Sequence, residues 1–492
     1  MPNSTTHRRS LLYYPVLLLV FGAGLWLILT TGARLNSPRT ISTVSNSPQP
    51  SSAPTPAPNS TNASQTPQTD ASKTAEGNQR SALSILLLQI IVIIILARLF
   101  GAVFRRIGQP PVMGEMVAGI ALGPSLLGWL YPPAMLFLFP PESLATLGLL
   151  SQVGVVLFMF VVGMELDVQL LREKASAAIM ISHASIFVPF LLGASLALLV
   201  YPTLAPAESS FAPFALFLGI AMSITAFPVL ARILADRGLS QSHLGSIALA
   251  CAAIDDVSAW CMLALVIAIS ESAGFTSSLM TVALTLVFIA AMLFVVKPKL
   301  AGLIERRVAD PKAARGLLAA VVAFLLASAW VTDRIGIHAL FGAFLAGVVM
   351  PTIPSFETFL KTRLEAFTSA ALLPLFFVFT GLRTEIALLN DWSGWLVCLG
   401  ITLVAVAGKL GGSMLMARWT SMNWRDSFAI GVLMNTRGLV ELVVLNIGYD
   451  LGILSARIFA MMVIMALATT FMTAPLLSLV KIKSSTVPEV ST

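Results

Sequence analysis

Two adjacent carboxylates, Asp255 and Asp256, lie halfway along an apolar run that extends from Leu244 to Ile269. As a helix, that run is roughly 39 Å long and can cross a bilayer, so the pair lies near the membrane midplane. A charge at that depth costs at least ~2.5–3.5 kcal/mol, and a like charge beside it raises the cost. Ionisable residues inside membranes usually bind or transfer ions. We therefore interpret the pair as an ion site; the alternative is a pair neutralised by hydrogen bonds and otherwise idle.

Two basic side chains also lie inside apolar segments. Lys409 is in the middle of the stretch from Val406 to Gly412, and Arg437 interrupts the apolar run around Leu433. Neither side chain can extend easily to the membrane surface, and an unpaired buried charge is costly. Each of the two therefore needs a partner inside the protein.

Two of the apolar segments contain residues that break helices. Pro228 removes a backbone donor and clashes with the preceding turn, which predicts a kink or break near Thr225. A polar stretch with a glycine interrupts a second segment far downstream. The residues that we expect to form the two breaks are Phe227, Pro228, Asn435, Thr436 and Gly438.

Backbone carbonyls at such breaks are tolerated in a membrane only where they are buried in protein or line a cavity. Small hard cations prefer oxygen ligands, and these breaks offer carbonyl and hydroxyl oxygens next to a carboxylate. We therefore predict a cation and proton site that contains Asp256, Asp255 and Thr225. The alternative for Thr225 is a hydroxyl that bonds back to its own helix at a proline kink.

The composition is that of a membrane protein. The chain of 492 residues is 57% hydrophobic and only 11% charged, whereas soluble domains carry about 25% charged residues. The net charge of +7 does not indicate a nucleic-acid partner, because most of the 30 Lys and Arg residues fall in short loops on one side of the expected membrane. The 3 cysteines lie in apolar segments without zinc-like spacing, so neither a disulfide framework nor a metal site is expected.

The expected fold is an all-α polytopic membrane protein with thirteen core transmembrane helices, plus one extra N-terminal hydrophobic helix. The thirteen apolar spans cover approximately residues 82–101, 112–130, 144–164, 176–200, 212–235, 244–270, 277–297, 314–331, 336–351, 365–382, 394–416, 427–448 and 457–480. Short basic loops mark the cytoplasmic side of a membrane protein. Both termini are therefore expected in the cytoplasm if the first helix is retained, with the protein in the plasma or inner membrane.

Composition divides the chain into four segments. These are residues 1–34, an N-terminal signal-anchor helix or signal peptide; 35–80, a disordered Ser/Thr/Pro-rich extracytoplasmic linker; 81–483, the transmembrane domain; and 484–492, a short cytoplasmic tail.

Two sets of three spans surround the breaks. They consist of residues 176–200, 212–235 and 244–270, and of residues 394–416, 427–448 and 457–480. An odd number of spans separates corresponding members, so the two sets have opposite orientations. This is the pattern of inverted repeats in which two discontinuous helices cross at the midplane. In such a crossing, Lys409 is placed to pair with Asp255.

These residues resemble the motifs of a known family. The acidic pair after the break at Thr225, together with Lys409 and the stretch from Asn435 to Glu441, is similar to the second family of monovalent cation:proton antiporters. That family includes the Kef-type, NapA-like and plant cation/proton exchangers. Residues 114–124 and 163–167 are similar to further motifs of the family, and residues 227–232 and 435–439 lean towards its plant-type branch. The resemblance covers residues 82–480.

The resemblance implies a core domain, built from the two sets of three spans, that moves against a dimerisation domain in the lipid bilayer. It implies a homodimer. It also implies that Asp256 is the main carrier and that Asp255 pairs with Lys409. Arg437 and Glu441 are expected to join Lys409 as ion-pair partners that compensate charge.

The leading hypothesis is a secondary active transporter, not an enzyme, that exchanges Na⁺ or K⁺ for protons by alternating access. Burial favours the neutral form of the Asp256 carboxyl group and nearby Lys409 favours the charged form, so a proton and a cation can compete for one site. No cofactor is expected. The only metal expected is the transported Na⁺ or K⁺, bound by Asp256 and Thr225.

Two alternatives stay open from the residues. A sodium-coupled organic anion symporter shares the architecture, but it needs a roomier polar cavity, and adjacent aspartates suit a cation. A cation channel is suggested by the stretch from Asn446 to Asp450, which faintly resembles a potassium filter. Such a filter needs a fourfold ring of carbonyls, however, and this stretch falls where a helix ends.

Overall fold

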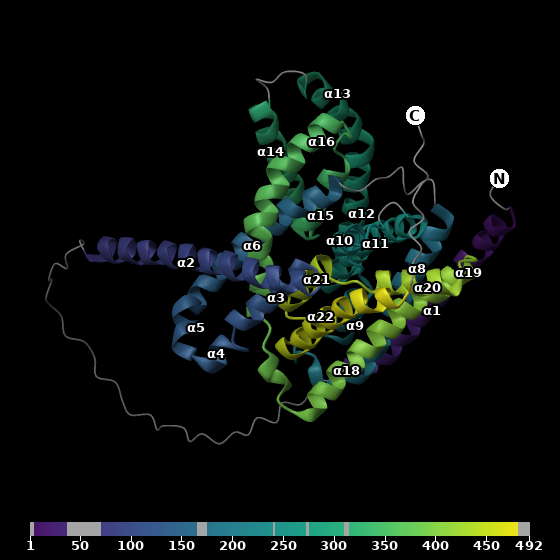
Figure 1. Ribbon diagram of the computed structural model, residues 1–492, viewed down its shortest axis with the longest axis horizontal. Helices are drawn as coiled ribbons and strands as arrows, with labels where there is room; N and C mark the ends of the chain where they lie inside the picture. The colour runs from purple at the N-terminus through teal and green to yellow at the C-terminus, as the bar shows by residue number, and fades with distance from the viewer. Residues whose placement is uncertain are drawn as a thin grey trace, which may run out of the picture.

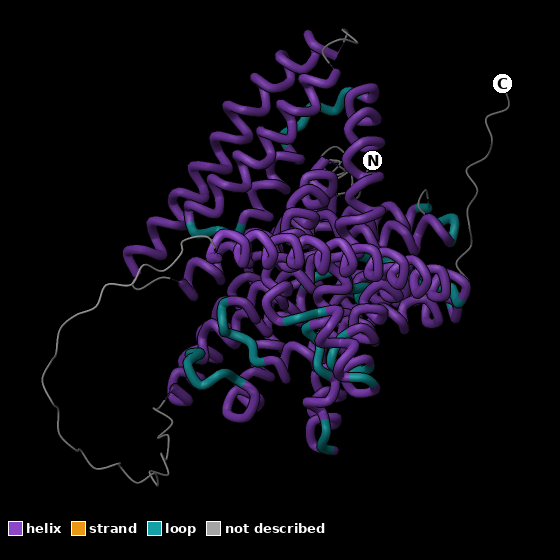
Figure 2. Tube along the Cα trace, turned by 90° about the vertical axis from the view of Figure 1, so that its left-hand side faces the viewer, coloured by secondary structure: helices purple, strands orange, loops and turns teal. Residues whose placement is uncertain are grey.

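The computed structural model describes residues 4–36, 70–164, 175–239, 242–271, 275–308 and 314–480. Within these ranges all regular structure is helical and no strand occurs (Figure 2). The predicted all-α class is therefore confirmed. Residues 37–69 of the predicted linker, motif residues 165–167 and residues 481–492, which include the predicted tail, lie outside the described ranges.

The helices follow one another through the whole described chain (Figure 1). The first half contains α1 (Ser4–Gly32), α2 (Asp70–Arg106), α3 (Pro111–Leu122), α4 (Leu127–Leu130), α5 (Pro132–Leu138), α6 (Pro141–Met164), α8 (Ala175–Leu204), α9 (Phe211–Ser223), α10 (Phe227–Asp236) and α11 (His243–Glu271). The second half contains α12 (Phe275–Ala291), α13 (Lys297–Val308), α14 (Ala314–Ile335), α15 (Ala339–Val348), α16 (Pro354–Leu360), α17 (Leu373–Leu382), α18 (Trp392–Val406), α19 (Gly412–Trp419), α20 (Trp424–Met434), α21 (Leu439–Asp450) and α22 (Ala456–Leu479).

The predicted number of thirteen core spans is not confirmed. Among the described residues, 11 helical segments, one of which is the N-terminal helix, are long and apolar enough to cross a membrane, or up to 12 if the bent pair α20 and α21 counts as one span. Each predicted span does contain a helix, but some of these helices are short. Helix α15 has 10 residues, which is only about 15 Å of helix. Helices α9 and α10 are short because a break separates them.

Helix α2 begins at Asp70, inside the segment predicted as linker. The physical reason lies in residues 70–81, which include Ala, Lys, Glu, Gln and Arg, all good helix formers. Extending a helix that the following apolar run has already nucleated costs far less than starting a new one. The boundary between linker and helix is therefore upstream of residue 81.

The helices form two packed groups. One, here called the scaffold group, consists of α2, α3, α6, α14, α15 and α17. The other, here called the crossing group, consists of α8 to α11 and α18 to α22, and it contains both interrupted helices. Within the scaffold group α3 packs closely on α17, since a Cβ added at Gly119 would lie 2.9 Å from Gly381.

Helix α1 packs along α8 of the crossing group. The Tyr14 hydroxyl lies 3.3 Å from Nε2 of His183. The ring of Phe21 stacks on Phe187 with centroids 4.3 Å apart and meets Phe190 edge-on at 5.4 Å. The N-terminal hydrophobic helix is therefore packed against the crossing group. This group contains the helices of the core domain that the resemblance implies.

Replacing Phe21 with alanine is expected to lower the free energy of unfolding by about 1–3 kcal/mol, because two aromatic contacts of roughly 0.5–1.5 kcal/mol each are lost. The melting temperature of the purified chain measures this loss. Leu19→Ala is the matched control, because Leu19 is on the same helix but 71% exposed, and it is expected to cause no shift. Equal shifts in both variants would contradict the packing of α1 on α8.

Candidate functional site

The two helix breaks meet in the middle of the crossing group. Helix α9 ends at Ser223 and α10 begins at Phe227, whereas α20 ends at Met434 and α21 begins at Leu439, with a bend of 42° between the latter pair. These positions are the ones that the helix-breaking residues predict. The two half-helices of each pair therefore present free backbone groups to the same interior region.

Backbone groups of one break bond to the other. The amide of Ala226 donates to the carbonyl of Thr436 at 2.9 Å. Gly438 permits this approach, because a Cβ added there would lie 3.1 Å from Ala226 and 2.8 Å from the side chain of Val229. The hydroxyl of Thr436 donates to Leu433 of its own helix end. The crossing is thus held by main-chain contacts that depend on a glycine.

Asp255 is fully buried and has four polar partners. Its Oδ1 accepts from the hydroxyl of Ser182 at 2.5 Å, and its Oδ2 lies 3.1 Å from the hydroxyl of Ser185. Oδ2 also accepts from the hydroxyl of Thr225 at 2.7 Å and forms an ion pair of 2.9 Å with Nζ of Lys409. A carboxylate with this many donors is stabilised in its charged form inside the membrane.

Lys409 connects Asp255 to the end of α9. Its ammonium group donates to the carbonyl of Ser185 at 3.0 Å and to the carbonyl of Ser223, the last residue of α9. Carbonyls at the C-terminus of a helix carry a partial negative charge. The three donors of the ammonium group are therefore all used, on one carboxylate and two carbonyls.

Arg437 continues the same arrangement. Its two terminal nitrogens donate to the carbonyls of Ala221 and Met222, at 2.8 Å each. Together with Lys409, it neutralises three consecutive carbonyls at the end of α9. Arg437 also lies 3.2 Å from Glu441, and both side chains are completely buried. The predicted set of charge-compensating residues is therefore assembled at the crossing.

Arg437→Gln is expected to lower the free energy of unfolding by about 3–5 kcal/mol, because it leaves the Glu441 carboxylate buried without a counter-charge. The double variant Arg437→Gln/Glu441→Gln should recover part of that loss, since no charge is then left unpaired. Melting temperatures of the two purified variants measure the difference. If the double variant were as unstable as the single one, the ion pair would not be the reason for the buried arginine.

Asp256 differs sharply from its neighbour. Consecutive residues of a helix point about 100° apart, so Asp256 leaves the cluster around Asp255. It is 2% exposed, and its Oδ1 has no hydrogen-bond partner among the described residues. The Oδ1 atom of Asn435, at the second break, is buried and also without a partner among them. Buried oxygens are rarely left unpaired. The Asp256 oxygen is therefore free to accept a proton or a cation, and the Asn435 amide oxygen is free to bind a cation.

The structure brings Asp255, Thr225 and Lys409 into direct contact, as the inverted-repeat argument predicts for the lysine. Thr225 was predicted to bind the cation beside Asp256, but its hydroxyl contacts Asp255 and lies 3.0 Å from the carbonyl of Met434. Its role as a cation ligand stays a prediction. Among the described residues, no three His, Cys, Asp or Glu side chains come together as a resident metal site would need.

Two residues of the site were missed. Ser182 and Ser185 on α8 hold both carboxylate oxygens of Asp255. A signal was available, because residues three apart share one face of a helix and this pair is polar within an apolar segment. The faintly filter-like stretch from Asn446 to Asp450 forms the end of helix α21. The carbonyls of Ile447, Gly448 and Tyr449 accept hydrogen bonds from amides of the turn that follows, so they are already occupied within the protein.

Comparison with known proteins gives a consistent result. A family model described as "Sodium/hydrogen exchanger, transmembrane" matches residues 91–479. The chain is 44% identical to the Na⁺/H⁺ antiporter NhaS4 of Synechocystis, over 80% of this chain and 97% of that protein. It is 42% identical to cation/H⁺ antiporter 17 of Arabidopsis thaliana, over 80% of this chain and 48% of the plant protein. It therefore spans about half the length of that relative.

A yeast relative and a solved structure extend the comparison. The chain is 35% identical to K⁺/H⁺ antiporter 1 of Saccharomyces cerevisiae, over 82% of this chain and 47% of the yeast protein. The structure of the sodium proton antiporter MjNhaP1 from Methanocaldococcus jannaschii at pH 8 superposes with a TM-score of 0.59. It covers 80% of this chain and 96% of that one at 15% sequence identity. This likeness concerns the fold alone.

Proposed function

Because this chain belongs to the family of transmembrane sodium/hydrogen exchangers, we propose that it exchanges Na⁺ or K⁺ for protons with Asp256 as the shared site. The chain is an integral membrane protein and a secondary active transporter, not an enzyme. Its relatives are named as antiporters for sodium, for potassium or for cations in general. The choice between Na⁺ and K⁺ is therefore left to measurement.

One observation carries the assignment to Asp256. Of the two adjacent aspartates, Asp255 is held by an ammonium group and three hydroxyls, whereas Asp256 has an oxygen without any partner among the described residues. A carboxylate whose two oxygens are both held by fixed partners is suited to a structural role. A buried carboxylate with a free oxygen binds a proton or, once deprotonated, a cation, but not both at once.

Charge compensation at α9 supports the same proposal. Lys409 and Arg437 neutralise the carbonyl end of α9. At the end of α20, by contrast, the side chains of the described residues donate only from uncharged hydroxyls, that of Thr436 to Leu433 and that of Thr225 to Met434. The partial negative charge of that second helix end therefore adds to the attraction of Asp256 for a cation. Thr225 and Asn435 at the breaks are the neutral oxygen ligands that we assign to the cation.

The symporter of organic anions is not favoured, because the matched relatives are named for cations and protons. The same family assignment supports two finer proposals. We assign the basic loops at Arg105, Arg237 and Arg425 to the cytoplasmic side by the positive-inside rule. We also infer a homodimer in the plasma or inner membrane, with α1 retained as a helix on α8.

The function is tested by flux in everted membrane vesicles with an imposed pH gradient. Addition of Na⁺ or K⁺ should dissipate the gradient, whereas a large organic cation that does not fit the site should not. Because protons compete with the cation, the cation concentration for half-maximal exchange should rise as the pH falls. Uptake of an organic anion coupled to Na⁺, without cation-driven proton movement, would contradict the proposal.

A further inference from the structure

Polar side chains join the scaffold group to the crossing group at the end of α21 that is remote from the helix crossing. Arg383 directly follows α17 of the scaffold group, and its Nη1 lies 3.1 Å from Oδ1 of Asn446 and 2.7 Å from Oδ1 of Asp450, both on α21. The amide nitrogen of Asn446 donates to the hydroxyl of Thr380 on α17 at 2.9 Å. These four residues are here called the Arg383 latch. They include both ends of the filter-like stretch, to which the proposed function assigns no role.

A contact between aromatic rings closes the same interface nearer to the ion site. Trp260 lies about one turn after Asp256 on α11, on the same face of that helix. Its side chain is buried and stacks on Phe344 of α15 in the scaffold group, with ring centroids 6.5 Å apart. About two turns further along α11, Ile267 lines a cavity of about 100 Å³ that also borders the end of α21. A route from Asp256 along this face of α11 towards the latch is therefore blocked by the aromatic pair.

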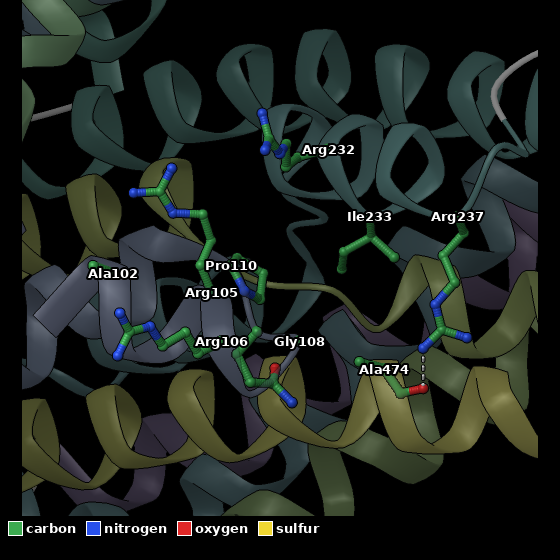
Figure 3. A pocket seen from close by; sticks show the side chains of 10 residues that line it. Ala102, Arg105, Arg106, Gly108, Pro110, Arg232, Ile233, Arg237 and Ala474 are labelled. Carbon is green, nitrogen blue, oxygen red and sulfur yellow. Dashed lines mark hydrogen bonds between the residues drawn. The ribbon is translucent and has the colours of Figure 1, made fainter.

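The two groups are further apart at the opposite end of α11. This helix has 29 residues, so its two ends are about 43 Å apart. Just before its start, a cavity of about 600 Å³ separates the connection between α2 and α3, in the scaffold group, from α10 and α22 in the crossing group. Figure 3 shows Arg105 and Arg106 on one wall, and Arg232 and Arg237 on the facing element. Arg237 donates to the carbonyl of Ala474 at 2.7 Å, which is a contact within the crossing group. The two groups are therefore apart at this end and in contact at the latch.

From this arrangement we propose that the Arg383 latch is a gate, and that its release lets a cation reach Asp256 from the side of the α21 end. The proposal rests on the proposed function, because exchange by alternating access requires the interface between the groups to open on each side in turn. Contacts that exist in only one of two states stabilise that state. Because the basic loop at Arg237 is assigned to the cytoplasm, the latch closes the extracytoplasmic side.

The exposure of the latch suits a contact that breaks in each transport cycle. The side chains of Arg383 and Asp450 are 26% and 40% exposed, so water can solvate both charges as they separate. An ion pair that water reaches stabilises the closed state only weakly. The guanidinium of Arg383 also lies over the ring of Phe379 on α17, 4.3 Å from its centroid. Arg383 therefore stays held by the scaffold group when α21 moves away.

The first test cross-links the two groups and measures cation-driven proton exchange in proteoliposomes. The three native cysteines are first replaced with alanine. Arg383→Cys/Asp450→Cys then places two thiols across the latch, and a reducible linker that matches the length of the removed ion pair joins them. The matched control is Asp391→Cys/Arg457→Cys, because that ion pair joins the start of α18 to α22 within the crossing group.

Linking the latch should abolish exchange, and cleavage of the linker by a reducing agent should restore the exchange rate of the unlinked variant. Linking the control pair should leave exchange unchanged, because both of its cysteines move with one group. Equal effects of the two linkers on exchange would overturn the gate. So would failure of the latch cysteines to link, because the contact itself would then be wrong.

A second measurement needs no transport activity. Ile267→Cys places a thiol in the small cavity beside the latch, where Ile267 is 4% exposed. A charged maleimide should label this thiol in detergent about threefold or more faster when Arg383→Gln is added, since loss of a partly exposed, charge-assisted contact has an effect of this size. Arg457→Gln is the control and should leave the labelling rate unchanged.

Equal labelling rates with and without Arg383→Gln would overturn the latch. Faster labelling in a chain whose wild type shows no cation–proton exchange would instead overturn the proposed function, because the latch would still close the interface between the two groups.

Discussion

Asp256→Asn is expected to reduce cation-driven proton flux to the level of vesicles without protein, while the chain still folds and inserts. Asparagine keeps the shape of aspartate and its ability to form hydrogen bonds, but it neither takes up a proton nor offers a negative ligand to a cation. The neighbouring Asp255 cannot replace it, because its oxygens are already held by Ser182, Ser185, Thr225 and Lys409. Exchange in proteoliposomes of the purified variant measures the loss.

The matched control is Glu357→Gln, which removes a carboxylate of a half-exposed ion pair with Lys361, 2.9 Å away. An exposed pair of this kind contributes at most about 1 kcal/mol, so exchange should be unaffected. Substantial cation-coupled proton flux through the Asp256→Asn protein would remove Asp256 from the mechanism and direct attention to Asp255.

Lys409→Gln is expected to slow exchange and make it electroneutral. The ammonium group has three partners in this structure, Asp255 and two carbonyls. If cation binding at Asp256 draws Asp255 away, Lys409 is left as an unpaired buried charge, which is relieved by release of its proton. That second proton makes the exchange of one cation move net charge. Glutamine carries no such proton, so only the one at Asp256 remains.

The measurement for Lys409→Gln is transport current in proteoliposomes under a clamped membrane potential. Removing the ammonium group also leaves Asp255 without its counter-charge, with an expected loss of stability of about 3–5 kcal/mol. The double variant Asp255→Asn/Lys409→Gln should regain part of that stability but not the current. A voltage-dependent exchange that persists unchanged in Lys409→Gln would leave the lysine as a purely structural partner of Asp255 and of the α9 carbonyls.

The sequence predicts those parts of the site whose residues carry a large free-energy cost in a membrane-spanning helix. The charges at Asp255, Asp256 and Lys409 are conspicuous because a charge inside an apolar span is destabilising, and such charges are usually paired or functional. Pro228 and Gly438 identify the breaks because they remove a donor or a side chain. Opposite orientation of the two sets of spans then predicts the contact between Lys409 and Asp255, which the structure contains.

The parts that the sequence did not predict depend on side chains that carry no unusual free-energy cost in a helix. A serine such as Ser182 is tolerated in any helix, so its spacing from Ser185 indicates a polar face of α8 but does not show that this face contacts Asp255. The predicted count of thirteen spans is not confirmed for a related reason, because hydrophobicity does not distinguish a long helix from the short α15 or the broken α9 and α10. The packing of Phe21 on α8 needs the relative position of two helices, which periodicity alone does not give.

Proton release on cation binding is the most direct test of the central claim that Asp256 binds either a proton or a cation. Purified protein in weakly buffered detergent solution is mixed with Na⁺ or K⁺, and the released protons are counted with a pH-sensitive dye. The wild type should release protons, and less cation should be needed as the pH rises. Asp256→Asn should release none that depend on the cation. Undiminished cation-dependent release from Asp256→Asn would contradict the account, because the shared site would then lie elsewhere.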